Sequence, residues 1–116
     1  MRRGRDFNLV TQSSVLPGST SARILEEVRQ VIFEVLANQD LSVYLFGSWA
    51  RGEATSISDI DVAIDPRNPL PRGLLAMLRE QLGESRIPYR VEVVDLSAAP
   101  SQFRERVLKE GILWNG

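Results

Sequence analysis

Three short segments rich in β-branched and aromatic residues constrain the fold of this chain most strongly. They lie at 42–46, 59–64 and 89–96, and their composition and boundaries are typical of strands. Apolar residues recur at helical spacing over 22–38, and further helices are predicted from Pro71 and from Ser101. This order predicts an α/β (α+β) fold, in which a small mixed sheet is flanked by helices.

The length of the chain, 116 residues, fits one domain with a modest core. We expect residues 1–20 to form a polar N-terminal arm, because a Pro-Gly pair and the Ser/Thr residues after it break any apolar pattern. The single predicted domain then spans 21–116. Within it, the Gly-Ser pair at 47–48 predicts a short helix over 48–53.

Composition excludes several kinds of chemistry. The chain contains neither cysteine nor histidine, which excludes disulfides, Cys/His zinc sites and histidine bases within it. Its formal net charge is −1, so we expect no direct nucleic-acid binding. No run approaches the ~20 apolar residues of a membrane span, and no apolar signal core follows the N-terminal arginines, so we expect a cytoplasmic protein.

Two aspartates, Asp59 and Asp61, open the second predicted strand. Residues two apart in a strand project to the same face, so these carboxylates lie side by side and repel unless a cation bridges them. Without histidine or cysteine, Mg²⁺ or Mn²⁺ bound by oxygen ligands is the natural counter-charge. The alternative is a solvated Asp-x-Asp pair on an edge strand, which the pair alone does not exclude.

A Gly-Ser turn, Gly47-Ser48, follows the first predicted strand. Glycine allows the backbone to approach a phosphate closely, and the exposed N–H groups at a helix start attract an anion. Ser48 adds a hydroxyl donor, and Arg51 adds a bidentate one. Alternatively, Gly47 simply ends the strand and Ser48 caps the turn. A phosphate cradle beside a metal-binding pair is what phosphoryl or nucleotidyl transfer requires.

The third predicted strand offers two candidates for a further carboxylate. Glu92 projects from mid-strand between two valines, where an unpaired charge would be costly. Asp95 lies at the end of the strand, where capping or solvent exposure explains it, and alternation turns it to the other face. We favour Glu92 as the third carboxylate, although an exposed residue on the polar face of an edge strand remains the alternative.

The segments GSWARG (47–52) and SDIDV (58–62) together resemble the motif of the DNA polymerase beta-like nucleotidyltransferases. In particular they are similar to the minimal nucleotidyltransferases, the MNT or MntA-like group. The likeness runs from about Val43 to Trp114 and includes the strand VEVVDL and the closing segment FRERVLKEGILW. It implies a polymerase beta-like nucleotidyltransferase core.

The resemblance also implies a mechanism. Asp59 and Asp61 would bind two divalent ions that bridge a nucleoside triphosphate, and Gly47 and Ser48 would hold its distal phosphates. Glu92 would share a metal and help to activate the acceptor hydroxyl while pyrophosphate leaves. Many relatives have aspartate at this third position; the longer glutamate side chain still coordinates metal.

The resemblance further implies a partner. Minimal nucleotidyltransferases, which this chain resembles, form one component of a two-protein system. The other component is a helical HEPN protein. In toxin–antitoxin versions, the nucleotidyltransferase is the antitoxin and transfers AMP from ATP to a tyrosine of the HEPN toxin. The predicted domain contains no separate acceptor-binding unit, so we expect another chain, or a second copy in a homodimer, to supply it.

Two other functions stay open at this point. One is a binding module, a degenerate relative that holds a nucleotide or a partner without catalysis. The other is nucleotidyl transfer to a small molecule such as an aminoglycoside. The three carboxylates favour an enzyme, but the sequence does not identify the acceptor.

Overall fold

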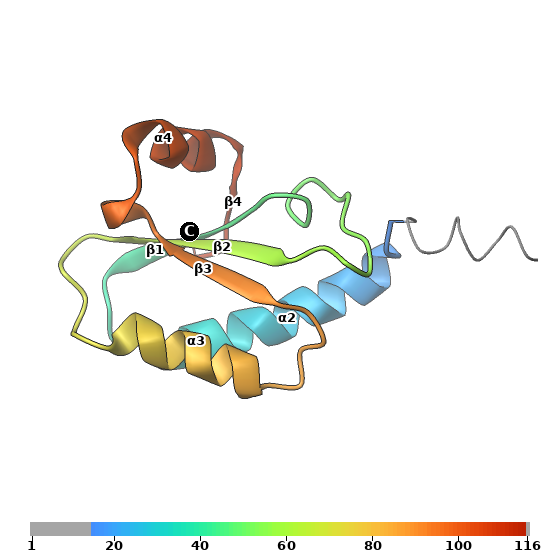
Figure 1. The fold of residues 1–116 in the computed structure, drawn as a ribbon, viewed down its shortest axis with the longest axis horizontal. Coiled ribbons are helices and arrows are strands. Elements are labelled where there is room, and N and C mark those ends of the chain that lie inside the picture. Colours follow the sequence, from blue (N-terminus) through green and yellow to red (C-terminus); the bar gives the residue numbers. More distant parts are fainter. Residues whose placement is uncertain (1–14, 116) are drawn as a thin grey trace, which may run out of the picture.

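The chain folds into three layers, with one sheet between helices on its two faces (Figure 1). The computed structural model describes residues 15–115. The helices are α2 (Gly18–Val35), α3 (Leu74–Glu84) and α4 (Ser101–Glu110), with a short 3-10 turn, η1 (Leu96–Ala98). The strands are β1 (Leu41–Phe46), β2 (Ile60–Pro66), β3 (Val91–Asp95) and β4 (Ile112–Leu113).

The four strands form a mixed sheet in the order β3-β2-β1-β4. β1 pairs antiparallel with both β2 and β4, whereas β2 pairs parallel with β3. A parallel pair needs a crossover connection, and α3 provides it between β2 and β3. The predicted mixed sheet flanked by helices is therefore confirmed.

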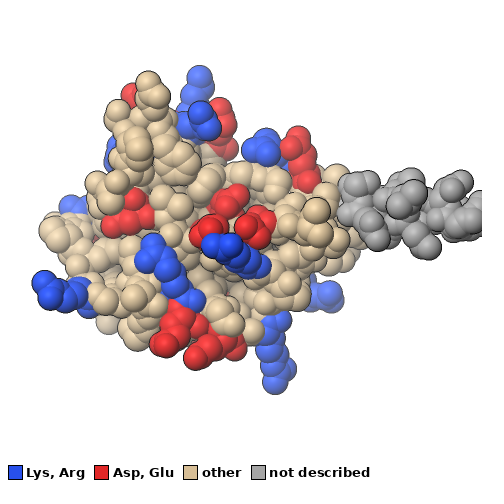
Figure 2. Space-filling model, in the orientation of Figure 1, with Lys and Arg blue, Asp and Glu red and all other residues tan. Residues whose placement is uncertain are grey.

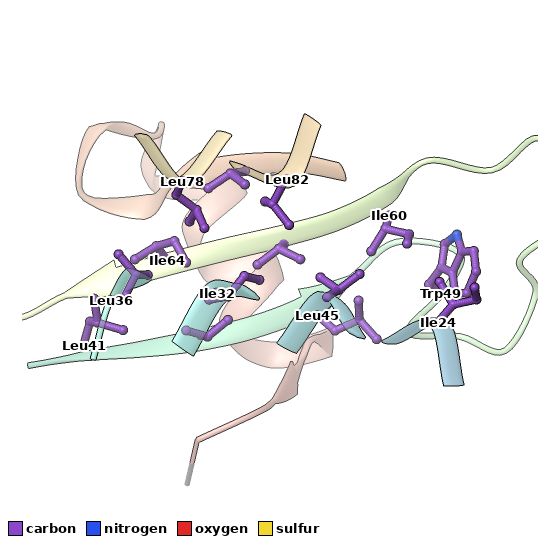
Figure 3. Packing of buried hydrophobic residues seen from close by; sticks show 14 of the residues in the cluster. Ile24, Ile32, Leu36, Leu41, Leu45, Trp49, Ile60, Ile64, Leu78 and Leu82 are labelled. Atoms are coloured by element: carbon purple, nitrogen blue, oxygen red, sulfur yellow. The ribbon is translucent and has the colours of Figure 1, made fainter. Parts of the chain in front are cut away.

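The main core lies between the sheet and the two helices α2 and α3. Figure 3 shows Ile32 of α2 and Leu78 of α3 directed toward the β2 residue Ile64, and all three are fully buried. Burying side chains of this size stabilises the fold by about 1.5–3 kcal/mol each. Because alternate strand residues face opposite ways, this packing directs Asp61 to the other face of β2.

A smaller core lies on that other face, beneath α4. It consists of the buried residues Ala63, Leu96 and Val107, with Phe46 and Phe103 packed beside them. The two phenylalanine rings meet edge to face, with centroids 5.5 Å apart. This layer places α4 beside one end of β1, which is the end that leads into the Gly-Ser turn.

Two helical predictions need correction. α2 begins at Gly18, so residues 18–20 are helical and not part of an arm, while residues 1–14 lie outside the described residues. The predicted helix at 48–53 is instead a series of turns. The amides of Ala50 and Arg51 both donate to the Gly47 carbonyl, but Gly52 has a φ of +72°, which a continuing helix excludes.

The strand β4 is a feature that the sequence does not predict. Two exposed residues carry no readable alternation, yet they pair with Tyr44 and Leu45 of β1. The Asn115 side chain extends this pairing, since its amide donates to the Leu41 carbonyl at 2.7 Å and its oxygen accepts from the Val43 amide at 2.8 Å. Among the described helices, none is long and apolar enough to cross a membrane.

Candidate active site

Gly47 lies directly against the carboxylate of Asp61. The antiparallel register pairs Phe46 with Asp61, so the residue that follows Phe46 comes alongside this side chain. A Cβ atom built on Gly47 would lie 2.3 Å from Asp61 Oδ2, and the glycine has a φ of +76°. Both observations require glycine at this position, because a side chain would clash and the backbone favours glycine.

Two of the three predicted carboxylates lie at neighbouring positions of the sheet, and the third directly precedes it. Asp61 and Glu92 are direct register partners in the parallel pair of β2 and β3. They therefore share one face of the sheet, which is the face on the side of α4. Asp59 precedes β2 and is exposed. Figure 2 shows acidic side chains gathered around a basic one near the start of β2.

The environment of Asp61 raises the pKa of its carboxyl above the ordinary value for an aspartate. Burial is the largest cause, because it disfavours the charged form. The negative charges of Asp59 and Glu92 raise the pKa further, and the positive charge of Arg51 opposes them. A group in this position gains from any bound cation that offsets its charge.

Glu92 forms an ion pair with an arginine that directly precedes β3. Arg90 Nη2 lies 2.9 Å from Glu92 Oε1, and both side chains are substantially exposed. Among residues 15–115, no three acidic side chains are arranged as a group that could hold a metal ion. Glu92 is therefore close enough to Asp61 to influence its pKa, but its carboxylate is paired with a guanidinium.

Asp95, the alternative third carboxylate, has a different role. Its Oδ1 accepts hydrogen bonds from the backbone amide and the hydroxyl of Ser97, at 2.9 and 2.6 Å. These contacts cap η1, and the register places Asp95 beside Ile64 rather than beside Asp61. The structure thus brings Glu92, and not Asp95, next to Asp61.

The predicted phosphate-binding residues lie on the turn that follows β1. Ser48 is half-buried, and its carbonyl accepts from the Glu53 amide at 2.9 Å, which closes the turn. The Arg51 side chain is exposed and pairs with Glu53, with 2.9 Å between Nε and Oε1. An exposed pair of this kind contributes little stability, so the guanidinium is available to an anion on the turn.

Trp49 fixes this turn to the loop that leads into β2. Its indole Nε1 donates to the Ser58 carbonyl at 3.2 Å, one residue before Asp59. The ring is buried and meets Tyr89 edge to face, with centroids 5.0 Å apart. In Figure 3 it lies at the end of the core beside Ile24. The structure therefore places Trp49 in the core.

A cleft of about 400 Å³ opens beside the turn, between β1 and α4. Gly47 and Arg51 line it on one side, and Phe103, Arg106 and Glu110 of α4 line it on the other. The sequence offered no sign of this cleft, because its two sides are more than 50 residues apart in the chain.

The donor set fits a hard divalent ion. Asp59 and Asp61 provide carboxylate oxygens, which Mg²⁺ and Mn²⁺ prefer, and Mg²⁺ typically uses one or two protein carboxylates together with substrate phosphates. The space that a Cβ on Gly47 would fill lies against Asp61 Oδ2. The Gly47 backbone and the Asp61 carboxylate are therefore close enough to contact one phosphate together with its bound metal ion. Two carboxylates and a phosphate-accessible turn are the minimum such a site needs.

The family model described as Polymerase beta, Nucleotidyltransferase matches residues 30–114. The chain belongs to this nucleotidyltransferase family, as its motif, its mixed sheet and the Gly47–Asp61 contact together indicate. Within the family it resembles the minimal nucleotidyltransferases.

Three relatives illustrate this likeness. A Haemophilus influenzae protein described as "Probable protein adenylyltransferase MntA" is 37% identical over 70 residues, which cover 60% of this chain and 61% of that protein. A structure described as "putative minimal nucleotidyltransferase" is 28% identical with a TM-score of 0.65, covering 79% of this chain and 93% of the other. A structure described as "the toxin-antitoxin with AMP-PNP" is 27% identical with a TM-score of 0.61, covering 75% and 73%.

Proposed function

We propose that this chain transfers a nucleoside monophosphate, AMP from ATP, to an acceptor hydroxyl of a partner protein. The single observation that carries the proposal is the contact of Gly47 with Asp61, which joins a phosphate-accessible turn to a carboxylate suited to a divalent ion. Membership of the nucleotidyltransferase family supports the reaction class. The likeness to the Haemophilus protein, over 61% of its length, supports AMP as the group and protein as the acceptor.

Each of the site residues has a role in this proposal. Asp59, Asp61 and Glu92 hold two Mg²⁺ ions, or Mn²⁺ in their place, and Gly47, Ser48 and Arg51 bind the distal phosphates of ATP. Divalent ions at this position would neutralise the negative charge of the triphosphate and of the departing pyrophosphate. The raised pKa of Asp61 supports the need for a cation beside it.

The reaction exchanges one phosphorus–oxygen bond for another. The acceptor oxygen bonds to the α-phosphorus of ATP, the bond from that phosphorus to the bridging oxygen breaks, and pyrophosphate leaves. Glu92 accepts the proton of the acceptor hydroxyl. The sheet order supports an in-line path, because Glu92 on β3 and the turn after β1 flank Asp61 on β2 from opposite sides.

The partner that fits this proposal is a HEPN protein whose tyrosine receives AMP, with this chain as the antitoxin of the pair. The structural likeness to a toxin–antitoxin complex with AMP-PNP supports that assignment. Such a pair would act in the cytoplasm as a hetero-oligomer.

Radiolabelled ATP tests the proposal directly. The protein is incubated with Mg²⁺, the protein encoded beside it and ATP labelled at the α- or the γ-phosphate. We expect label on the neighbour protein from α-labelled ATP only, since γ-label would leave with pyrophosphate. The Asp59→Asn/Asp61→Asn variant should give none, and mass spectrometry should locate the added AMP on a tyrosine.

Two matched single variants separate the candidates for the third carboxylate. Glu92→Gln should reduce labelling by about 100-fold or more, as expected for loss of a proton acceptor and metal ligand. Asp95→Asn should retain it, because Asp95 caps η1. If wild type and the double variant bind the neighbour equally and neither transfers label from any of the four nucleotides, the chain is a binding module. Label on an aminoglycoside but not on protein would identify a small-molecule acceptor.

A further inference from the structure

We propose that Arg90 is a positioning residue. It pairs with the Glu92 carboxylate and so keeps that carboxylate from the divalent-ion site until an ion binds there. This inference rests on the proposed function, since it concerns how the same site is loaded. In the structure Glu92 pairs with Arg90, and when a divalent ion binds, the Glu92 carboxylate exchanges that guanidinium for the ion.

The position of Arg90 makes this exchange a local event. Arg90 and Glu92 are two residues apart along one strand direction, so their side chains lie on the same side, with 2.9 Å between Nη2 and Oε1. The Arg90 carbonyl accepts from the Ile60 amide at 2.9 Å, and Ile60 lies between Asp59 and Asp61. The Arg90 backbone is therefore fixed at the start of β2, next to the segment that carries Asp59 and Asp61.

The strength of the pair suits a temporary contact. The side chains of Arg90 and Glu92 are 70% and 45% exposed, and exposed ion pairs are weak. A divalent ion carries twice the charge and also attracts Asp59 and Asp61, so it can displace the guanidinium.

A groove beside β3 offers space for the Arg90 side chain once it is released. Arg90 and Glu92 both line a groove of about 380 Å³ along β3, together with Arg79, Ile87 and Tyr89. β3 is an edge strand on the far side of Asp61 from the Gly-Ser turn. A released guanidinium thus has space at the outer edge of the sheet.

Metal affinity of the substrate-free protein tests the proposal. The dissociation constant for Mn²⁺ is measured by calorimetry and by the electron paramagnetic resonance signal of free Mn²⁺. Arg90→Gln should tighten binding by about two- to fivefold, which is the loss of a competing pair of up to about 1 kcal/mol. Arg90→Lys, which keeps a cation, should restore part of the wild-type value, and Arg72→Gln on the exposed loop after β2 should leave it unchanged.

A double-mutant cycle separates competition at Glu92 from a general change in charge. If Arg90 acts through Glu92, Arg90→Gln has no effect on Mn²⁺ affinity when Glu92→Gln is already present. If the tightening persists undiminished in that background, Arg90 acts only through the field of its charge, and the proposal is wrong.

The outcomes also separate this inference from the proposed function. If the wild type binds Mn²⁺ and Arg90→Gln does not increase the affinity, only the role of Arg90 is overturned. The proposed nucleotidyl transfer is then unaffected. Failure of the substrate-free wild type to bind Mn²⁺ also overturns the role of Arg90, whereas the proposed function is overturned separately, when no label is transferred from ATP in the presence of Mg²⁺. Thermal unfolding of each variant checks that the compared proteins are folded.

Discussion

Gly47 and Asp61 meet at a separation that leaves no room for a side chain on the glycine. This contact places backbone amides and a carboxylate of raised pKa within one small volume. At the residue scale, the proposed function therefore depends on a missing Cβ and on one charge that folding leaves poorly compensated. Each of these features can be changed by a single substitution.

Gly47→Ala should abolish ligand binding as well as weaken the fold. Its φ of +76° costs an alanine about 1–2 kcal/mol, and the new Cβ would push Asp61 Oδ2 from its position. Gly52→Ala is the matched control, because Gly52 has a φ of +72° but nothing within 4 Å of the added atom. We expect similar losses of thermal stability and loss of Mn²⁺ and ATP binding in Gly47→Ala only. Equal binding by both variants would show that the contact is not needed.

Asp61→Asn should stabilise the metal-free protein at neutral pH while removing its activity. Because folding raises the pKa of Asp61, the folded state holds this proton more tightly, and stability falls as pH rises from 3.8 through the folded pKa. The variant has no such charge, so thermal unfolding should show equal midpoints at the acid end of this window and a higher midpoint for Asp61→Asn above it. A wild type that gains stability relative to the variant as pH rises would contradict this sign.

At the element scale, the turn after β1 is not a helix and depends on tertiary contacts for its shape. Trp49 supplies them, through its hydrogen bond to the Ser58 carbonyl and its packing against Tyr89. The same side chain therefore fixes the phosphate-binding turn and the loop that ends at Asp59. A helix of regular geometry would not need such an anchor.

Trp49→Phe should loosen the turn without emptying the core. It removes the indole donor, a loss of about 0.5–1.5 kcal/mol, and leaves an aromatic ring against Tyr89. We expect a several-fold higher KM for ATP with a smaller change in kcat. Trp114→Phe is the control, since Trp114 contacts Arg29 of α2 and lies at the other edge of the sheet. It should lower stability and leave KM unchanged; an equal rise in KM would assign the effect to the whole fold.

At the scale of the whole molecule, binding and stability are linked. The site joins β1, β2 and β3, so a ligand held by all three opposes unfolding of the sheet. The Gly-Ser turn and the two strands come together only in the folded chain. Ligand binding should therefore increase the free energy of unfolding of the domain.

Mg²⁺ with a non-hydrolysable ATP analogue should raise the unfolding free energy of the wild type. At a ligand concentration 100-fold above the dissociation constant, the expected gain is about 2.7 kcal/mol. The Asp59→Asn/Asp61→Asn variant should show no gain, and the analogue without Mg²⁺ should give a smaller one in the wild type. Thermal scans over a series of ligand concentrations measure this, and a concentration-independent midpoint would contradict binding at this site.

Much of the fold was accessible from the sequence because its signals are local. Helical spacing predicted α2, α3 and α4, and short β-branched runs predicted three strands, since side-chain periodicity follows directly from backbone geometry. The start of α2 at Gly18 and the turns at 48–53 were predicted wrongly. At Gly52 the positive φ ends the helical turns, a conformation that glycine adopts readily.

The sequence by itself determined the helices, three of the strands and the residue types available for chemistry, because these follow from local pattern and composition, and its motif carried the resemblance to the family. Only the tertiary structure decided which distant residues meet. Strand register set Glu92 rather than Asp95 beside Asp61, and antiparallel pairing brought Gly47 against the same carboxylate. Pairing between strands is a long-range choice made by burial of the whole core. For that reason the Arg90–Glu92 pair and the strand β4 became visible only in the folded chain.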